Sequence, residues 1–255
     1  MEERIALVRE PSSRIAEGIV THIDRTPVDA ALAAEQHAAY VTALADAGWA
    51  IREVEPADDL PDSAFIEDTM VVCDGLAVLA RPGAEERRGE LAGAEVAVRE
   101  LGLELARIEA PGTLDGGDVL QVGDTVYVGR GGRTNGEGIR QLRRHLAPRG
   151  RTVVPVPLKQ VLHLKSAVTA LPDGTLIAAD PDLVDTTPFP TLRRVPEEGG
   201  AHVVLIGGGT VLMAGSAPRS AALFEDLGFD VVAVDVGEFE KMEGCVTCLS
   251  VLVRR

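Results

Sequence analysis

The chain of 255 residues has few aromatic side chains, few cysteines and no long apolar run. Aromatic residues make up 3% of it, too few for the stacking platforms that hold single-stranded nucleic acids. Three cysteines, Cys73, Cys245 and Cys248, cannot form a disulfide framework, and a second ligand pair for a structural zinc is missing. No apolar run approaches the roughly 18 residues of a membrane-spanning helix, and the N-terminus lacks the basic-then-apolar order of a signal peptide. These absences favour a cytoplasmic protein without a membrane partner.

Positive charge is also in deficit, because 25 Lys and Arg residues face 40 Asp and Glu residues, for a formal net charge of -15. Such a field repels phosphate and disfavours nucleic acid and anionic membranes as partners, whereas it would attract a small cationic substrate. A hydrophobic content of 45% is enough for a full core, and we expect one domain over residues 1–255. The sequence leaves a homodimer open.

Four segments share one pattern, in which a strand, a tight glycine-containing turn and a second strand precede a helix. They cover residues 69–80, 119–129, 167–178 and 202–213. Their turns are Asp74-Gly75, Gly123-Asp124, Asp173-Gly174 and Gly208-Gly209, dipeptides that tolerate the positive φ of short hairpins. The spacing of about 50, 50 and 35 residues falls in the range that indicates a repeat architecture.

Helix signals fall between these hairpins, and one strand is left over at each end of the chain. We expect helices from Thr26-Pro27 to Gly48 and over 85–101, 135–146 and 218–227. Pairing of the remaining strands, 5–8 and 246–253, would close a ring and remove exposed sheet edges. The pattern therefore predicts an α/β fold, a five-bladed propeller of ββαβ modules around a pseudo-fivefold axis. An ordinary mixed α/β sheet is the alternative.

Two acidic pairs lie where the strands are expected to begin. Glu67 and Asp68 are adjacent, so on a strand one of the two carboxylates would point to the buried side and need a cation or hydrogen-bond donors. Asp115 and Asp118 flank a flexible Gly-Gly, which would let the backbone approach a ligand closely. Taken alone, either pair also fits an exposed strand end or turn.

A histidine and a cysteine pair occupy comparable positions in other modules. His163 lies between two leucines ahead of a strand, where most histidines are hydrogen-bonded core residues. Cys245 and Cys248 lie three residues apart, and on a strand their sulfurs would face opposite sides, which argues against a metal or redox pair. In a ring, however, such positions converge on one axis, where a base could activate a thiol.

Taken in order, the motifs resemble the dimethylarginine dimethylaminohydrolase family over nearly the whole chain. That family belongs to the guanidine-modifying superfamily, with the pentein fold, a five-bladed α/β propeller. Any one motif would be weak evidence, but the set is specific. It comprises Phe-Ile-Glu-Asp at 65–68, Arg81 to Glu90, Leu-Asp-Gly-Gly-Asp at 114–118, Arg-Thr-Asn at 133–135, Leu-His-Leu-Lys at 162–165 and Thr-Cys-Leu-Ser at 247–250.

The resemblance implies hydrolysis of Nω-methylated L-arginine to L-citrulline and a methylamine, without a metal or an organic cofactor. Cys248 matches the nucleophile that attacks the guanidinium carbon and forms a covalent thiouronium intermediate. His163 matches the residue that protonates the departing amine and then activates water. Asp115 would hold the imidazole, and Asp68 would pair with the substrate guanidinium.

The same resemblance implies a set of substrate contacts. Arg87 and Arg133 match the positions that hold the α-carboxylate, and Asp62 matches the group that binds the α-amino end. The backbones of Ile19 and Met242 match loop contacts over the ligand, and Glu67 lies in the same contact region.

Alternatives within and outside the superfamily remain open at this point. Arginine deiminases place an acidic residue two positions after the histidine, where this chain has Lys165, and usually carry an added helical domain. An arginine deiminase or another guanidine hydrolase is therefore the second hypothesis. A non-catalytic amino-acid-binding protein and a Cys-x-x-Cys metal or redox module are the others.

Overall fold

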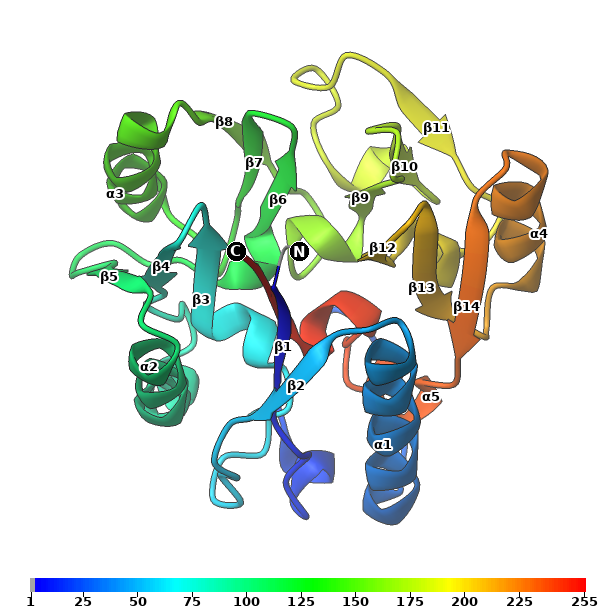
Figure 1. Cartoon of the computed structure of the whole chain (residues 1–255), viewed down its shortest axis with the longest axis horizontal. Coiled ribbons are helices and arrows are strands. Elements are labelled where there is room, and N and C mark those ends of the chain that lie inside the picture. Colours follow the sequence, from blue (N-terminus) through cyan, green and yellow to red (C-terminus); the bar gives the residue numbers. More distant parts are fainter. Residues whose placement is uncertain (1–2) are drawn as a thin grey trace.

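The computed structural model describes residues 3–255, which form five three-stranded sheets arranged like blades around an axis (Figure 1). The strands are β1 (Arg4–Val8), β2 (Ala50–Glu53), β3 (Met70–Cys73), β4 (Leu76–Leu79), β5 (Glu104–Arg107), β6 (Val119–Val122), β7 (Thr125–Arg130), β8 (Thr152–Pro157), β9 (Val168–Ala170), β10 (Leu176–Ala178), β11 (Leu192–Arg194), β12 (Val203–Gly207), β13 (Thr210–Ala214), β14 (Asp230–Val234) and β15 (Val251–Arg254). The predicted five-bladed propeller is confirmed.

Helices lie outside the sheets or lead into them. The α-helices are α1 (Ala30–Asp46), α2 (Leu91–Glu100), α3 (Gly136–Leu146), α4 (Pro218–Asp226) and α5 (Gly237–Glu240). The 3-10 helices are η1 (Ile15–Glu17), η2 (Ile66–Thr69), η3 (Glu85–Glu90), η4 (Gly116–Asp118), η5 (Ala147–Arg149), η6 (Leu164–Ser166), η7 (Pro181–Leu183), η8 (Glu198–Ala201) and η9 (Val246–Leu249). Within the described chain, no helix is long and apolar enough to cross a membrane.

Each blade has the same pairing, an antiparallel pair followed by a parallel one. In the sheet β3-β4-β5, for example, β3 pairs antiparallel with β4, and β4 pairs parallel with β5. Asp74 and Gly75 both have positive φ, 48° and 78°, which the tight hairpin between β3 and β4 requires. The parallel step needs a crossover, and helix α2 supplies it on the outside of the blade (Figure 1).

The fifth blade joins the two ends of the chain. β15 pairs antiparallel with β1, with Arg4 opposite Arg254 and Leu7 opposite Val251, and β1 pairs in parallel with β2. The predicted pairing of first and last strands is therefore confirmed, and the ring has no open edge between its first and last blades.

Three expected elements differ from the structure. The third blade crosses from β10 to β11 through the 3-10 helix η7, so its module lacks the expected α-helix. The chain from 246 to 249 forms η9 instead of strand, and β15 begins at Val251. The helix expected from Thr26 begins at Ala30, because Asp29 caps it by accepting hydrogen bonds from the N–H groups of Ala31 and Leu32.

The hydrophobic core is divided among the interfaces between neighbouring blades. One cluster joins Val78 of the first blade to Val126 of the second, and another joins Val156 to Leu176. Leu7 packs with Leu79 in the cluster that closes the ring. Packing between blades therefore fixes the geometry at the axis, where the ends of the inner strands meet.

Candidate active site

Every blade enters its innermost strand through a short 3-10 helix. These helices are η2 before β3, η4 before β6, η6 before β9, η8 before β12 and η9 before β15. They converge on the axis, as expected for equivalent positions in a ring. Four of them bring the candidate catalytic groups together: Asp68 lies in η2, Asp115 precedes η4, His163 precedes η6 and Cys248 lies in η9.

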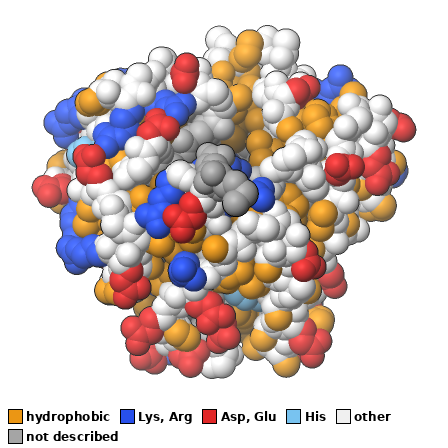
Figure 2. Space-filling model, in the orientation of Figure 1, with side chains coloured by type: hydrophobic (Ala, Val, Ile, Leu, Met, Phe, Trp, Pro, Cys, Tyr) orange, Lys and Arg blue, Asp and Glu red, His pale blue; other side chains and the backbone are white. Residues whose placement is uncertain are grey.

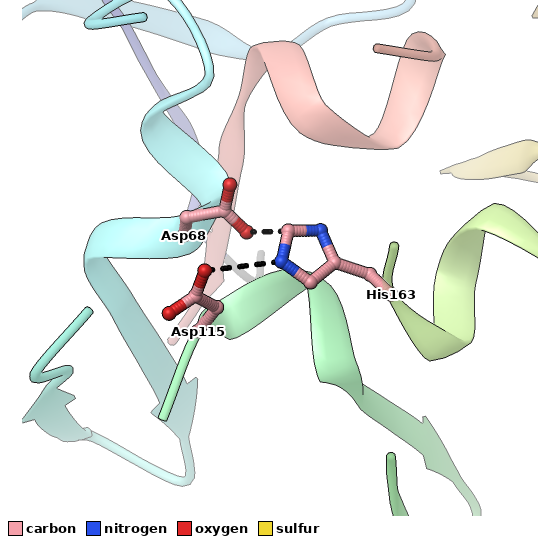
Figure 3. Close-up of side chains that lie close together, drawn as sticks. All are labelled: Asp68, Asp115 and His163. Atoms are coloured by element: carbon pink, nitrogen blue, oxygen red, sulfur yellow. Dashed lines mark hydrogen bonds and ion pairs between the residues drawn. The ribbon is translucent and has the colours of Figure 1, made fainter. Parts of the chain in front are cut away.

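The His163 imidazole lies against two buried carboxylates (Figure 3). Its Nε2 is hydrogen-bonded to Asp115 Oδ2 at 3.1 Å, and its Nδ1 lies 3.8 Å from Asp68 Oδ1. Asp115 is itself held in place, because its Oδ1 accepts the N–H of Gly83 at 2.9 Å. The predicted contact between Asp115 and His163 is present in the structure.

These carboxylates control the protonation of His163. Burial alone would lower the pKa of the imidazole, but the charge of Asp68 and the hydrogen bond with Asp115 outweigh it and raise the pKa to about 9. The imidazole is therefore protonated at neutral pH in the ligand-free protein, as a general acid must be.

Asp68 accepts hydrogen bonds on both oxygens. Its Oδ2 accepts from Arg87 Nη1 at 2.5 Å and its Oδ1 from the N–H of Gly117 at 2.8 Å. Burial alone would raise the pKa of Asp68, but His163 and Arg87 hold it well below its usual range. Arg87 is in turn bound through Nε and Nη2 to both carboxylate oxygens of Glu90, at 2.9 and 2.8 Å. Asp68 therefore stays ionised, available for a cation.

Glu67 points to a different partner from Asp68. Its Oε1 accepts from Lys165 Nζ at 2.6 Å, and both side chains border a cavity of about 210 Å³ on β6 and β12. The two acids belong to η2 and not to a strand, but they do diverge as expected. Burial raises the pKa of Glu67 to about 8, against the opposing effect of Lys165.

The two cysteines lie side by side, contrary to the sequence-based expectation. Residues three apart in a 3-10 helix lie on the same side, and the Sγ atoms of Cys245 and Cys248 are 3.4 Å apart. Gly244 makes this turn possible, since a Cβ there would collide with the ring of Phe65. The hydrogen bond with Cys245, burial and the nearby charge of Glu67 raise the pKa of the Cys248 thiol.

A small cavity collects most of the predicted site. Its volume of about 20 Å³ has room for about one water molecule, so substrate entry requires part of its wall to move. Ile19 and Asp62 form one part of that wall, with the Ile19 N–H donating to both Asp62 oxygens at 3.1 and 3.2 Å. The predicted residues that line the cavity are Ile19, Asp62, Asp68, Arg87, Arg133, His163, Met242 and Cys248.

Asp115 and Glu67 do not line this cavity in the ligand-free form. Asp115 lies behind the imidazole, and Glu67 points toward Lys165. Arg133 differs from Arg87 in being less engaged, because its nearest carboxylate, Asp115, lies 3.8 Å from Nη1.

Two supporting residues were missing from the predicted set. Asp118 Oδ1 accepts the Leu164 N–H at 2.9 Å and so fixes the chain next to His163. Glu90 fixes Arg87. Asp118 belongs to the Leu-Asp-Gly-Gly-Asp motif and could have been selected from it, whereas a helical glutamate such as Glu90 carries no distinguishing signal.

Asp68, Asp115 and His163 also lie close enough together to hold a metal ion, and neither Cys245 nor Cys248 belongs to that group. The hydrogen bonds already described satisfy both aspartates, and a protonated imidazole offers no lone pair to a metal. The arrangement fits an imidazolium held by carboxylates.

Curated relatives carry the same name as the family suggested by the motifs. The chain is 59% identical over 254 residues to the N(G),N(G)-dimethylarginine dimethylaminohydrolase of Streptomyces coelicolor, covering 100% of this chain and 98% of the relative. It is 36% identical over 250 residues to the enzyme of that name from Pseudomonas aeruginosa, covering 96% and 97%. The chain belongs to the dimethylarginine dimethylaminohydrolase family. No family model matches it.

Solved dimethylarginine dimethylaminohydrolase structures have the same architecture. One is the Pseudomonas aeruginosa enzyme as a cysteine-to-serine mutant with citrulline, and another is an adduct with S-methyl-L-thiocitrulline. Each superposes with a TM-score of 0.92 at 34% identity, covering 99% of this chain and 100% of the other. The five-bladed arrangement is thus that of the dimethylarginine dimethylaminohydrolases.

Proposed function

We propose that the protein hydrolyses Nω-methylated L-arginine, as asymmetric dimethylarginine or monomethylarginine, to L-citrulline and a methylamine. The observation that carries this proposal is the meeting of Cys248, His163 and Asp68 at one closed cavity in a member of this family. A thiol, a protonated imidazole and an ionised carboxylate are the groups that amidine hydrolysis needs. This reaction uses the chain's own side chains and needs no metal or organic cofactor.

Binding begins with the positive charge of the substrate. The ionised Asp68 pairs with the guanidinium, and Arg133 binds the α-carboxylate. Arg87 is a second donor to the α-carboxylate, through the Nη1 hydrogen that does not point at Asp68. Asp62 receives the α-amino group in place of the Ile19 N–H that it binds in the free protein. The backbone of Ile19 and that of Met242 close over the ligand, and Glu67 supports the region beneath it.

The thiolate forms when the substrate arrives. The hydrogen bond with Cys245, burial and the charges of Glu67 and Asp68 raise the pKa of Cys248, and a guanidinium bound at Asp68 offsets those negative charges. Cys248 Sγ then attacks the guanidinium carbon to give a tetrahedral adduct. His163 transfers a proton to the methylated nitrogen, and the carbon–nitrogen bond breaks to release the methylamine and leave a thiouronium.

Water completes the reaction at the same carbon. The neutral His163 accepts a proton from water as its oxygen attacks the thiouronium, and collapse of the second adduct breaks the carbon–sulfur bond. The remaining hydroxyl proton of the adduct passes to the departing sulfur, so the products are L-citrulline, the Cys248 thiol and a reprotonated imidazole. The proton that the thiol gave up when the substrate arrived leaves on the methylamine, which is released as its ammonium form. Asp115 orients the ring in both steps through its hydrogen bond to Nε2.

Lys165 supports the choice of methylated substrates over arginine. Lys165 occupies the sequence position where arginine deiminases have an acid, and its ammonium group binds Glu67. The site therefore lacks a second carboxylate around the distal nitrogens of the substrate. A carboxylate facing N-methyl groups would lose its hydration without gaining a donor. An arginine deiminase activity remains the competing function.

A substrate panel with colorimetric citrulline detection tests the proposal. We expect kcat/KM for asymmetric dimethylarginine or monomethylarginine to exceed that for arginine by about 100-fold or more, equal to about 2.7 kcal/mol of transition-state binding. A larger kcat/KM for arginine would show a deiminase. Calorimetric binding of methylarginine without citrulline release would show a binding protein.

A further inference from the structure

The thiols of Cys245 and Cys248 are in direct contact, as two cysteines that can form a disulfide must be. Cys245 caps η9, Cys248 lies inside it, and the Cys248 N–H donates to the Cys245 carbonyl oxygen at 3.0 Å. The two sulfur atoms, 3.4 Å apart, need to approach by about 1.4 Å to reach the length of a disulfide bond. Rotation about the two side-chain χ1 angles can supply a movement of that size.

The two sulfurs border different cavities. Cys248 lines the small cavity of about 20 Å³ that forms the candidate active site. Cys245 lines a much larger one of about 650 Å³, which lies beyond Gly244 and includes His202 of the fourth blade. The cavity at Cys245 therefore has room for a small solute, whereas the one at Cys248 has room for about one water molecule.

The surroundings of Cys245 favour its thiolate over that of Cys248. Its Sγ lies within hydrogen-bonding distance of the Cys248 sulfur and of the Thr247 hydroxyl, at 3.4 and 3.2 Å. The hydrogen bond with Cys248 and the charge of His202 lower the pKa of Cys245. The hydrogen bond with Cys245, burial and the charge of Glu67 raise the pKa of Cys248. The thiol that opens to the larger cavity is thus the better nucleophile in the resting protein.

We propose that Cys245 is an oxidation site for hydroperoxides and that its oxidation leads to a reversible Cys245–Cys248 disulfide that withdraws the nucleophile from catalysis. The effect on catalysis rests on the proposed function, whereas the formation of the disulfide does not. The fourth blade, whose η8 brings no catalytic group, contributes instead to the cavity through which the oxidant enters.

The reaction has two balanced steps. The Cys245 thiolate attacks one oxygen of the hydroperoxide, the oxygen–oxygen bond breaks, and the sulfur becomes a sulfenic acid while hydroxide or alkoxide leaves. The Cys248 sulfur then attacks the Cys245 sulfur and gives up its proton, and the sulfenic oxygen leaves as water. Two thiols are oxidised and one peroxide is reduced. A dithiol reduces the Cys245–Cys248 disulfide back to two thiols by thiol–disulfide exchange.

Mass spectrometry of the peroxide-treated protein tests the site directly. Trypsin cleavage after Lys241 and Arg254 places both cysteines in one peptide, which a disulfide makes about 2 Da lighter and resistant to alkylation. Purified full-length protein is treated with hydrogen peroxide, alkylated under denaturing conditions and digested, and citrulline formation is measured before and after dithiothreitol. The matched control is Cys73→Ser, since Cys73 lies in β3 beside Asp74.

We expect wild type and Cys73→Ser to form the lighter peptide, to lose activity by about tenfold or more and to regain it with dithiothreitol. Cys245→Ser and Cys245→Ala should form no lighter peptide and should lose less than about twofold of their own starting activity, because the remaining Cys248 lies at the small cavity and its thiolate is disfavoured. If Cys245 of the wild type can still be alkylated after peroxide has removed the activity, the proposal is overturned. If no variant makes citrulline before treatment, the proposed function is wrong, and the peptide mass alone then decides whether the disulfide forms.

Discussion

The Sγ atoms of Cys245 and Cys248 lie 3.4 Å apart, yet only Cys248 lines the cavity that also holds His163 and Asp68. We predict from this relationship that Cys248→Ser lowers citrulline formation by at least about 10³-fold, because a hydroxyl is a far weaker nucleophile than a thiolate. Cys245→Ser should lower kcat by no more than about tenfold, since it removes a hydrogen-bond partner and not a reacting atom.

Steady-state kinetics of the two variants under reducing conditions check this prediction. Circular dichroism and thermal unfolding should show both variants folded, since each substitution replaces one sulfur atom. Equal loss of activity in the two variants would reject the assignment of the nucleophile to Cys248.

The pH profile should report the carboxylates around His163. Between pH 6.5 and 9 the imidazole in this site is protonated where an ordinary one is not, so kcat/KM should fall as the pH rises through about 9. Asp115→Asn replaces the charged acceptor on Nε2 by a neutral one, which lowers the pKa of His163 toward 6.5 and moves the falling limb to lower pH. We also expect kcat at neutral pH to drop by about 10²-fold.

An unchanged falling limb in Asp115→Asn, measured as kcat/KM from pH 6 to 10, would contradict the assignment of that limb to His163.

Stability should change in the same direction as activity. Because the pKa of His163 is raised, the stabilisation from the protonated imidazole is complete below pH 6.5 and is lost as the pH rises through about 9. Urea unfolding of the wild type over the same range measures this loss.

The ring could be predicted because its signals are local and repeated. Asp74-Gly75 reads as a hairpin turn from the sequence, and it does adopt the positive φ angles that such a turn needs. Closure by β1 and β15 followed from two strands that lacked partners, since an unpaired edge is costly to leave exposed. The apolar alternation of these segments carries the same information in each blade.

The geometry at the axis could not be predicted, because it depends on 3-10 helices that have no sequence signature. Val246 and Leu249 are as apolar as strand residues, so the sequence predicts a strand there, and the resulting prediction that the two sulfurs face opposite sides is wrong. The same limit applies to Glu67, since its pairing with Lys165 joins two blades across 98 residues. No periodicity within either segment specifies such a contact.

Arg133 should determine affinity for the α-carboxylate. We predict that Arg133→Ala raises KM by about 10- to 100-fold, the loss of charge-assisted hydrogen bonds worth about 1.5–3 kcal/mol, with a smaller change in kcat. Arg133→Lys should recover part of this loss, because an ammonium cannot reproduce the paired donors of the guanidinium. The exposed Arg130 at the end of β7 gives the control variant Arg130→Ala.

A substrate analogue without the carboxylate isolates this role. The decarboxylated form of dimethylarginine should react with Arg133→Ala and wild type at rates within about threefold, because neither has a carboxylate contact to lose. If Arg133→Ala is equally impaired toward the analogue, the arginine supports the fold of the site and not the α-carboxylate.

Gly117 offers a way to displace His163 without removing any ionisable group. A Cβ at this position would lie 2.7 Å from His163 Nδ1 and 2.7 Å from Asp68 Oδ1, too close for either to stay in place. The side chains of His163 and Asp68 therefore occupy the space that a side chain at Gly117 would need. We predict that Gly117→Ala lowers kcat by about 10²-fold, the effect of misplacing a reacting group by about 1 Å.

Gly136→Ala is the matched control, since nothing lies within 4 Å of a Cβ added at Gly136 in the first turn of α3. It should leave kcat unchanged, and alanine in a helix should keep or raise the thermal stability. Gly117→Ala should lower the free energy of unfolding by about 1–3 kcal/mol through overpacking, which leaves a folded protein for kinetics. If its kcat matches that of Gly136→Ala, His163 and Asp68 tolerate displacement, and their close contact with Gly117 is not required for catalysis.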